Sequence, residues 1–83
     1  MDERALAALK RLDAIADEML LEYRGRPNIA HEPAFQKLSA VKSNVRNVLE
    51  SHTNPYCVSS VEGSLTTLRE VVKYFGLQKR LQP

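Results

Sequence analysis

The fold is decided by residues 3–25, which read ERALAALKRLDAIADEMLLEYRG. Apolar side chains recur in this segment at steps of four and three residues, a spacing that keeps returning to one side of an α-helix. They are Ala5, Leu9, Leu12, Ala16, Met19 and Tyr23. Asp2 can cap the first turn, and Gly25 follows the last periodic residue, where helices commonly stop. The pattern predicts an amphipathic helix over about residues 3–24.

Two further segments show the same period. The second begins at Pro33, a favourable first helical residue. Its apolar positions are Ala34, Leu38, Val41, Val45 and Val48. The third begins near Ser59, which has capping-box spacing to Glu62, and stops at Gly76. Its apolar positions are Val61, Leu65, Leu68, Val72 and Phe75. We expect helices over about residues 33–52 and 60–75, with a short tail over 76–83.

Three apolar stripes joined by short links predict an all-α fold, a three-helix up-down-up bundle that occupies residues 1–83 as a single domain. A chain of 83 residues buries only about 60% of the surface that its unfolded state exposes, so a lone monomer is marginally stable. Self-association would supply the missing burial. We therefore expect a homodimer, in which a second copy completes the bundle.

Composition favours an intracellular protein. Lys and Arg number 12 against 10 Asp and Glu, which gives a net charge of +2 at pH 7. Cys57 is the single cysteine, so it can form neither an internal disulfide nor a cysteine-rich zinc site. The first residues, MDERALAALKRLDAIADE, are charged throughout and lack the apolar core of a signal peptide. We expect the protein to be cytoplasmic.

The sequence contains no motif for metal or cofactor chemistry. His31 and His52 are the only histidines, and they lie in separate connecting regions without HExxH spacing. No phosphate-binding loop surrounds Gly63. We therefore expect no cofactor, no metal and no catalytic residue, and we expect that the protein is not an enzyme.

Apolar side chains near the C-terminus exceed what the predicted core stripe uses. Val71 and Tyr74 lie to one side of that stripe, and Leu77 and Leu81 extend the same direction if the helix continues. Four basic residues accompany them, namely Arg69, Lys73, Lys79 and Arg80. Apolar anchors inside a polar rim are typical of protein interfaces, and a basic rim steers an acidic partner. The sequence predicts a non-enzymatic protein–protein interaction module (an adaptor, assembly factor or small inhibitor) that docks through these eight residues.

Nucleic-acid binding is the first alternative. Residues 42–83 hold six Lys or Arg against three Asp or Glu, a net charge of +3, whereas residues 1–41 have a net charge of −1. A basic half of this kind could bind phosphates, and salt would then weaken the complex steeply.

A second alternative comes from RNVLESH, residues 46–52. Arg46, Asn47 and His52 form an arginine, a following polar residue and a histidine a few residues on, and this arrangement resembles the motif of HEPN-type helical ribonucleases. The resemblance covers these seven residues. It implies a helical bundle that dimerises at RNA, with His52 handling a proton and Arg46 stabilising phosphate charge.

Overall fold

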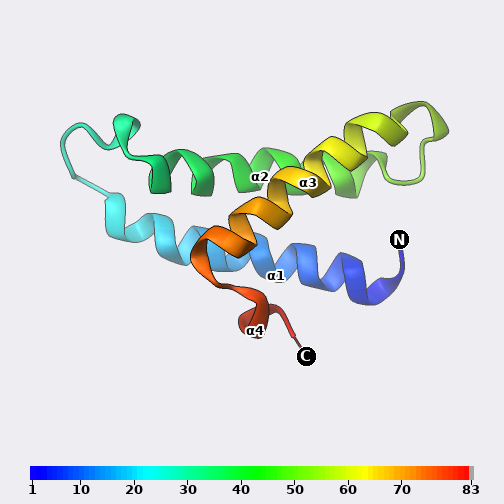
Figure 1. Ribbon diagram of the computed structural model, residues 1–83, viewed down its shortest axis with the longest axis horizontal. Coiled ribbons are helices and arrows are strands. Elements are labelled where there is room, and N and C mark those ends of the chain that lie inside the picture. Colours follow the sequence, from blue (N-terminus) through cyan, green and yellow to red (C-terminus); the bar gives the residue numbers. More distant parts are fainter. Residues whose placement is uncertain (83) are drawn as a thin grey trace.

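The computed structural model describes residues 1–82, and helices account for most of them (Figure 1). The helices are α1 (Glu3–Leu20), α2 (Pro33–Ser51), α3 (Val58–Phe75) and α4 (Gln78–Leu81). Short 3-10 turns occupy Leu21–Tyr23, Ile29–His31 and Pro55–Cys57. No strand occurs within residues 1–82. The predicted all-α helical bundle is therefore confirmed.

The helix ends follow from local chemistry that the sequence displays. The side chain of Asp2 accepts a hydrogen bond from the Ala5 amide at 2.8 Å and so caps α1. Gly76 ends α3 in the left-handed conformation, with φ of 65°, and the Leu77 amide then donates to the Val72 carbonyl at 2.9 Å. This is the bond pattern of a Schellman stop, which glycine adopts without steric cost.

Two helix ends differ from prediction. The first α-helix ends at Leu20 rather than near residue 24, because its last turn tightens into the 3-10 turn Leu21–Tyr23. The third helix begins at Val58 rather than near residue 60. Pro55–Cys57 already forms a 3-10 turn, with the Asn54 side chain accepting from the Tyr56 amide at 2.9 Å. This turn leads directly into α3, so Ser59 is not the N-cap.

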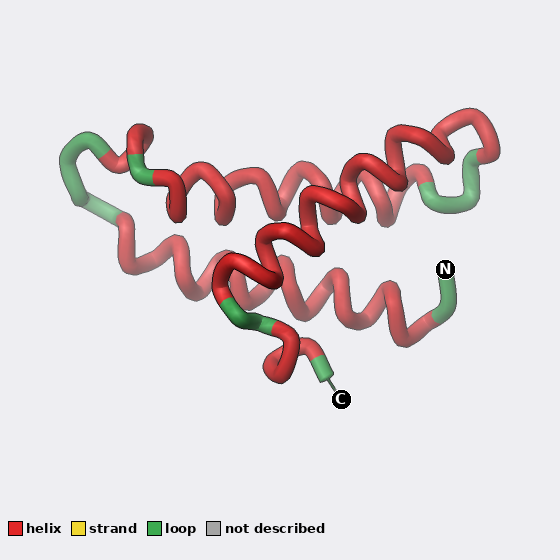
Figure 2. The backbone as a smooth tube through the Cα atoms, viewed as in Figure 1, coloured by secondary structure: helices red, strands yellow, loops and turns green. Residues whose placement is uncertain are grey.

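The second helix, α2, is the central element. It packs against α1 on one side and against α3 on another, whereas α1 and α3 make no comparable contact with each other among the described residues. Figure 1 shows α1 and α2 running side by side and α3 crossing them obliquely. The two loops that join the three long helices lie at opposite ends of the molecule (Figure 2). An up-down-up path results, with its third helix tilted away from the first.

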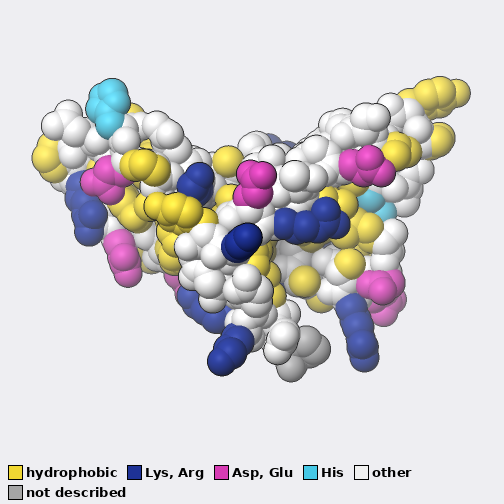
Figure 3. Space-filling model, in the orientation of Figure 1, with side chains coloured by type: hydrophobic (Ala, Val, Ile, Leu, Met, Phe, Trp, Pro, Cys, Tyr) yellow, Lys and Arg dark blue, Asp and Glu magenta, His cyan; other side chains and the backbone are white. Residues whose placement is uncertain are grey.

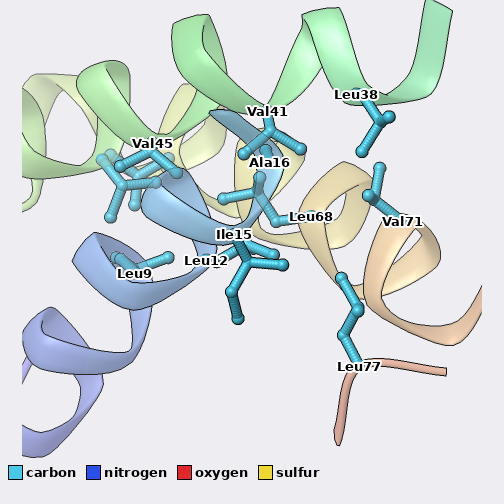
Figure 4. Packing of buried hydrophobic residues seen from close by; sticks show 12 residues of the cluster. Leu9, Leu12, Ile15, Ala16, Leu38, Val41, Val45, Leu68, Val71 and Leu77 are labelled. Atoms are coloured by element: carbon cyan, nitrogen blue, oxygen red, sulfur yellow. The ribbon is translucent and has the colours of Figure 1, made fainter. Parts of the chain in front are cut away.

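The core draws on all three long helices and on the turn after α3 (Figure 4). Ile15, Leu38, Val41 and Val48 are the largest side chains that are fully buried. The other buried apolar side chains are Leu9, Leu12, Ala16, Val45, Val61, Leu68, Val71 and Leu77. Removal of these apolar side chains from water is the main stabilising contribution to the fold.

The buried side of α3 is rotated relative to the predicted stripe. Ser64 and Val71 are buried, while Leu65, Val72 and Phe75 are only half-buried. Ser64 faces α2 because its hydroxyl accepts a hydrogen bond from the Asn47 amide group at 2.9 Å. Val71 lies two turns further along the same side of α3 and is carried into the core with it. The expectation that Val71 lies off the core is therefore wrong.

An exposed ion pair joins α1 to α2. The Lys42 Nζ atom lies 2.9 Å from Oδ1 of Asp17 and 3.9 Å from Oδ1 of Asp13. The hydrogen bond to Asp17, aided by the charge of Asp13, raises the pKa of Lys42 above its ordinary value of 10.5. The pair therefore favours the folded state below that value and ceases to do so as the pH rises through the raised pKa. Because the group is exposed to solvent, its contribution is small.

Asn47→Ala tests whether the contact with Ser64 holds α3 in this rotation. Loss of the amide leaves the nearly buried Ser64 hydroxyl without its partner on α2, so we expect the free energy of unfolding to fall by about 1–3 kcal/mol in urea titrations. Asn44→Ala is the matched control, because the Asn44 amide bonds only to the Ala40 carbonyl of its own helix. The double variant Asn47→Ala, Ser64→Ala should recover part of the loss. Strict additivity of the two changes would contradict the coupling.

Candidate functional site

An apolar groove lies between the N-terminal half of α1 and α3, and α4 closes one end of it. Its volume is about 380 Å³. We call it the α1–α3 groove, and its lining residues are Ala8, Leu9, Leu12, Leu65, Leu68, Arg69, Val72, Gln78 and Leu81. Only two of these residues, Arg69 and Gln78, have polar side chains. Figure 3 shows hydrophobic side chains inside the hollow between α3 and the N-terminal part of α1.

The groove exists because α3 is packed onto α2 and tilted away from α1. Its floor is formed by buried core side chains, Leu9 and Leu12 from α1 and Leu68 from α3. Half-buried side chains form its walls, with Leu65 and Val72 on the α3 side. A helix of another molecule laid along this groove would contact apolar side chains from two elements at once.

A second hollow, of about 550 Å³, adjoins the groove beyond α4. The two hollows share Ala8 and Leu81 as lining residues, so their surfaces are continuous. Across both, four arginines take part in the lining: Arg4, Arg11, Arg69 and Arg80. Among the residues that the structure describes, no Asp or Glu lines either hollow. The site therefore combines an apolar floor with a purely cationic border.

One of the four arginines forms an ion pair within residues 1–82. The Arg80 Nη2 atom lies 3.2 Å from Oε2 of Glu18, and both side chains are largely exposed. Arg11 donates from Nε to the Arg80 carbonyl oxygen at 3.4 Å, which ties α4 to α1 but neutralises no charge. Among the described residues, Arg4, Arg11 and Arg69 have no carboxylate partner.

The structure does not gather the predicted docking residues on one exposed face. Val71 and Leu77 are each 3% exposed and belong to the core, so the expectation of free surface is wrong for both. Leu77 is buried because the Gly76 turn reverses the chain and the helix does not continue. Tyr74 is exposed, but its ring lies against Phe75 and below Lys37 of α2. Leu81 alone of the four apolar residues lines the groove.

The predicted basic rim is divided in the same way. Arg69 and Arg80 border the α1–α3 groove and its adjoining hollow, whereas Lys73 and Lys79 are exposed and line neither. Sequence reasoning missed the contribution of α1, namely Ala8, Leu9 and Leu12 in the groove and Arg4 and Arg11 in the adjoining hollow. The sequence of α3 contains a signal from which the groove could have been found. Its apolar residues Leu65, Leu68, Val71 and Val72 form one wide stripe on the helix surface. That stripe is broader than one neighbouring helix can cover.

The ribonuclease-like residues do not share one side of α2. Arg46 and His52 are six positions apart, which separates them by about 120° around the helix axis. Arg46 is exposed beside Lys42 and Glu50. The His52 Nδ1 atom lies 3.0 Å from the Val48 carbonyl oxygen, to which it donates. Asn47 directs its amide at Ser60 and Ser64 of α3.

Residues 1–82 lack two features that would indicate a metal-binding or a membrane protein. No set of three or more His, Cys, Asp or Glu side chains is arranged so that it could hold a metal ion. In the same part of the chain, none of the helices has the length and apolar character needed to cross a lipid bilayer.

Comparison of the chain with protein families, with curated proteins and with solved structures found no match. The site is therefore interpreted from its own geometry.

Leu77→Asp should unfold the protein, whereas Tyr74→Ala should leave it folded. The Leu77 side chain is in the core, so the substitution removes apolar burial and places a carboxyl group there. We expect a loss of about 3 kcal/mol or more in the free energy of unfolding. Tyr74 is exposed, and its truncation should cost about 1 kcal/mol or less. Thermal and urea unfolding followed by circular dichroism would measure both, and equal midpoints would contradict the assignment of Leu77 to the core.

Proposed function

We propose that this chain is a non-enzymatic protein–protein interaction module, and that the α1–α3 groove receives an amphipathic helix of another protein. The observation that carries the proposal is the groove itself, in which apolar side chains of α1, α3 and α4 surround a hollow of about 380 Å³. Burial of apolar surface is the general driving force for such docking.

The arrangement of the helices supports a helix as the occupant. The described residues form three long helices, and the groove presents apolar side chains from two of them and from α4, which a fourth helix would cover. Helices that dock in grooves use apolar side chains at i, i+3, i+4 and i+7, which form one stripe. Such a stripe would pack onto the floor at Leu9 and Leu68 and between the walls at Ala8 and Leu65.

Adaptors, assembly factors and small inhibitors all work by docking of this kind, so the proposal covers these three roles. We place the protein in the cytoplasm on the composition of the chain, in particular its single cysteine, Cys57. A second copy of the chain is the competing occupant of the groove, and the oligomeric state in solution distinguishes it from a separate partner.

Nucleic-acid binding is the second candidate, because four arginines and, within residues 1–82, no carboxylate line the two hollows. Arginine side chains bind phosphate well. The apolar floor argues against it, since phosphates and sugars would leave Leu65 and Val72 in contact with water. No aromatic side chain, on which a base could stack, lines either hollow.

Leu65→Glu tests the groove as a docking site. The probe is a peptide of about 15 residues, close to four helical turns, with leucines at the spacing given above and glutamine elsewhere. Leu65 is half-buried in the wall, so a carboxylate there would be desolvated by a docked helix. We expect binding, measured by fluorescence anisotropy, to weaken at least about tenfold, which corresponds to about 1.4 kcal/mol.

Thr66→Glu is the matched control, because Thr66 is the exposed neighbour of Leu65 and does not line the groove. It should bind the peptide as the unchanged protein does, and both variants should retain their helicity by circular dichroism. Light scattering gives the oligomeric state of each protein. Absence of peptide binding to the unchanged chain, or a dimer that Leu65→Glu dissociates, would overturn the proposal of a separate partner helix.

A further inference from the structure

The charges around the groove restrict which helix can dock there. Because the same groove is concerned, this selectivity depends on the proposed function. We infer that the partner helix carries carboxylates on the flanks of its apolar stripe, and that Arg4 and Arg11 of α1 and Arg69 of α3 recognise them.

Arg69 lines the groove, whereas Arg4 and Arg11 line the adjoining hollow, which meets the groove at Ala8 and Leu81. Arg4 and Arg11 are seven residues apart on α1, which puts them on the same side of that helix and about 10.5 Å apart along its axis. Arg69 belongs to α3 and lines the groove together with Leu65 and Val72. A helix that covers the groove and extends over the adjoining hollow would therefore meet Arg69 from α3 and Arg4 and Arg11 from α1.

Ion pairs neutralise three basic groups within residues 1–82, and one of them, Arg80, belongs to this site. Lys42 pairs with Asp17, and Arg26 lies 3.9 Å from Glu32. Arg4, Arg11 and Arg69 have no carboxylate partner within residues 1–82, as is also true of six basic side chains elsewhere, and what sets these three apart is that they gather around an apolar hollow that no Asp or Glu of residues 1–82 lines. Like charges gathered around an apolar hollow repel one another, and the repulsion grows when an occupant removes the water that screens them. Carboxylates on the occupant convert this repulsion into attraction, and guanidinium groups can bind them through two parallel hydrogen bonds.

The same charges disfavour the other occupants. Two copies of the chain that met groove to groove would bring eight arginines together, since each copy contributes four. A nucleic acid would pair with the arginines but would leave the apolar floor without an apolar partner. A small molecule with a single carboxylate could pair with the arginines of one helix but not with those of both helices. An acidic amphipathic helix satisfies the floor and the arginines of both helices together.

The experiment compares three peptides that share the leucine stripe of the neutral probe and differ only in their flanks, which carry Glu, Gln or Lys. At low salt we expect the Glu peptide to bind at least about tenfold more tightly than the Lys peptide, and we expect added salt to reduce this difference. The double variant Arg4→Glu, Arg69→Glu should reverse the preference. The double variant Arg24→Glu, Arg46→Glu is the charge-matched control, because both arginines are exposed and line neither the groove nor the adjoining hollow.

The outcomes separate this inference from the proposed function. Equal affinity for the three peptides would overturn the charge selection and leave the groove as a docking site, whereas no binding of any peptide would overturn both. A single-stranded oligonucleotide serves as the last probe. If it binds with dependence on Arg4 and Arg69 but not on Leu65, the border recognises phosphate and the inference is wrong.

Discussion

The whole arrangement depends on the burial of α2 against two helices at once. Leu38, Val41 and Val48 of α2 are fully buried, and α2 packs against both α1 and α3. With both contacts made by the central helix, α1 and α3 need not contact each other along their lengths. The oblique crossing of α3 and the groove beside it follow from this packing around α2. A compact bundle in which each helix touched the other two would have no such hollow.

A polar pair decides which side of α3 takes part in that packing. Ser64 lies among apolar side chains, where a hydroxyl group without a hydrogen-bond partner would lower the stability of the fold. The amide of Asn47 bonds both this hydroxyl and that of Ser60, at 2.9 and 3.0 Å. Hydrogen bonds are directional, whereas apolar packing tolerates small rotations, so the pair selects one rotation of α3 among several with similar apolar burial. Leu65 and Val72 are thereby left on the α1 side, where they line the groove.

The existence and type of every long helix could be predicted from the sequence, because the apolar period and the end signals at Asp2, Pro33 and Gly76 are local. The rotation of α3 could not be predicted in the same way. Val71 and Val72 are adjacent and chemically identical, and the choice between them depends on Asn47, a residue of another helix. The burial of Leu77 could be predicted in part from the sequence, because a left-handed glycine at a helix end commonly folds the following apolar residue back onto the helix. The same residue was also expected on an exposed face, and the turn at Gly76 overrides that expectation.

The candidate site shows why only part of an interface between helices is visible in a sequence. Arg69 and Arg80 could be named as rim residues because they neighbour apolar positions along the chain. Arg4 and Arg11 reach the same site from the other end of the chain, and nothing local relates them to α3. The wall residues Leu65 and Val72 were predicted as core, and their chemistry is that of core residues. What they lack is a fourth helix to cover them. If a partner helix docks there as proposed, docking and stability are coupled, since a partner that binds only the folded chain shifts the folding equilibrium toward it by mass action.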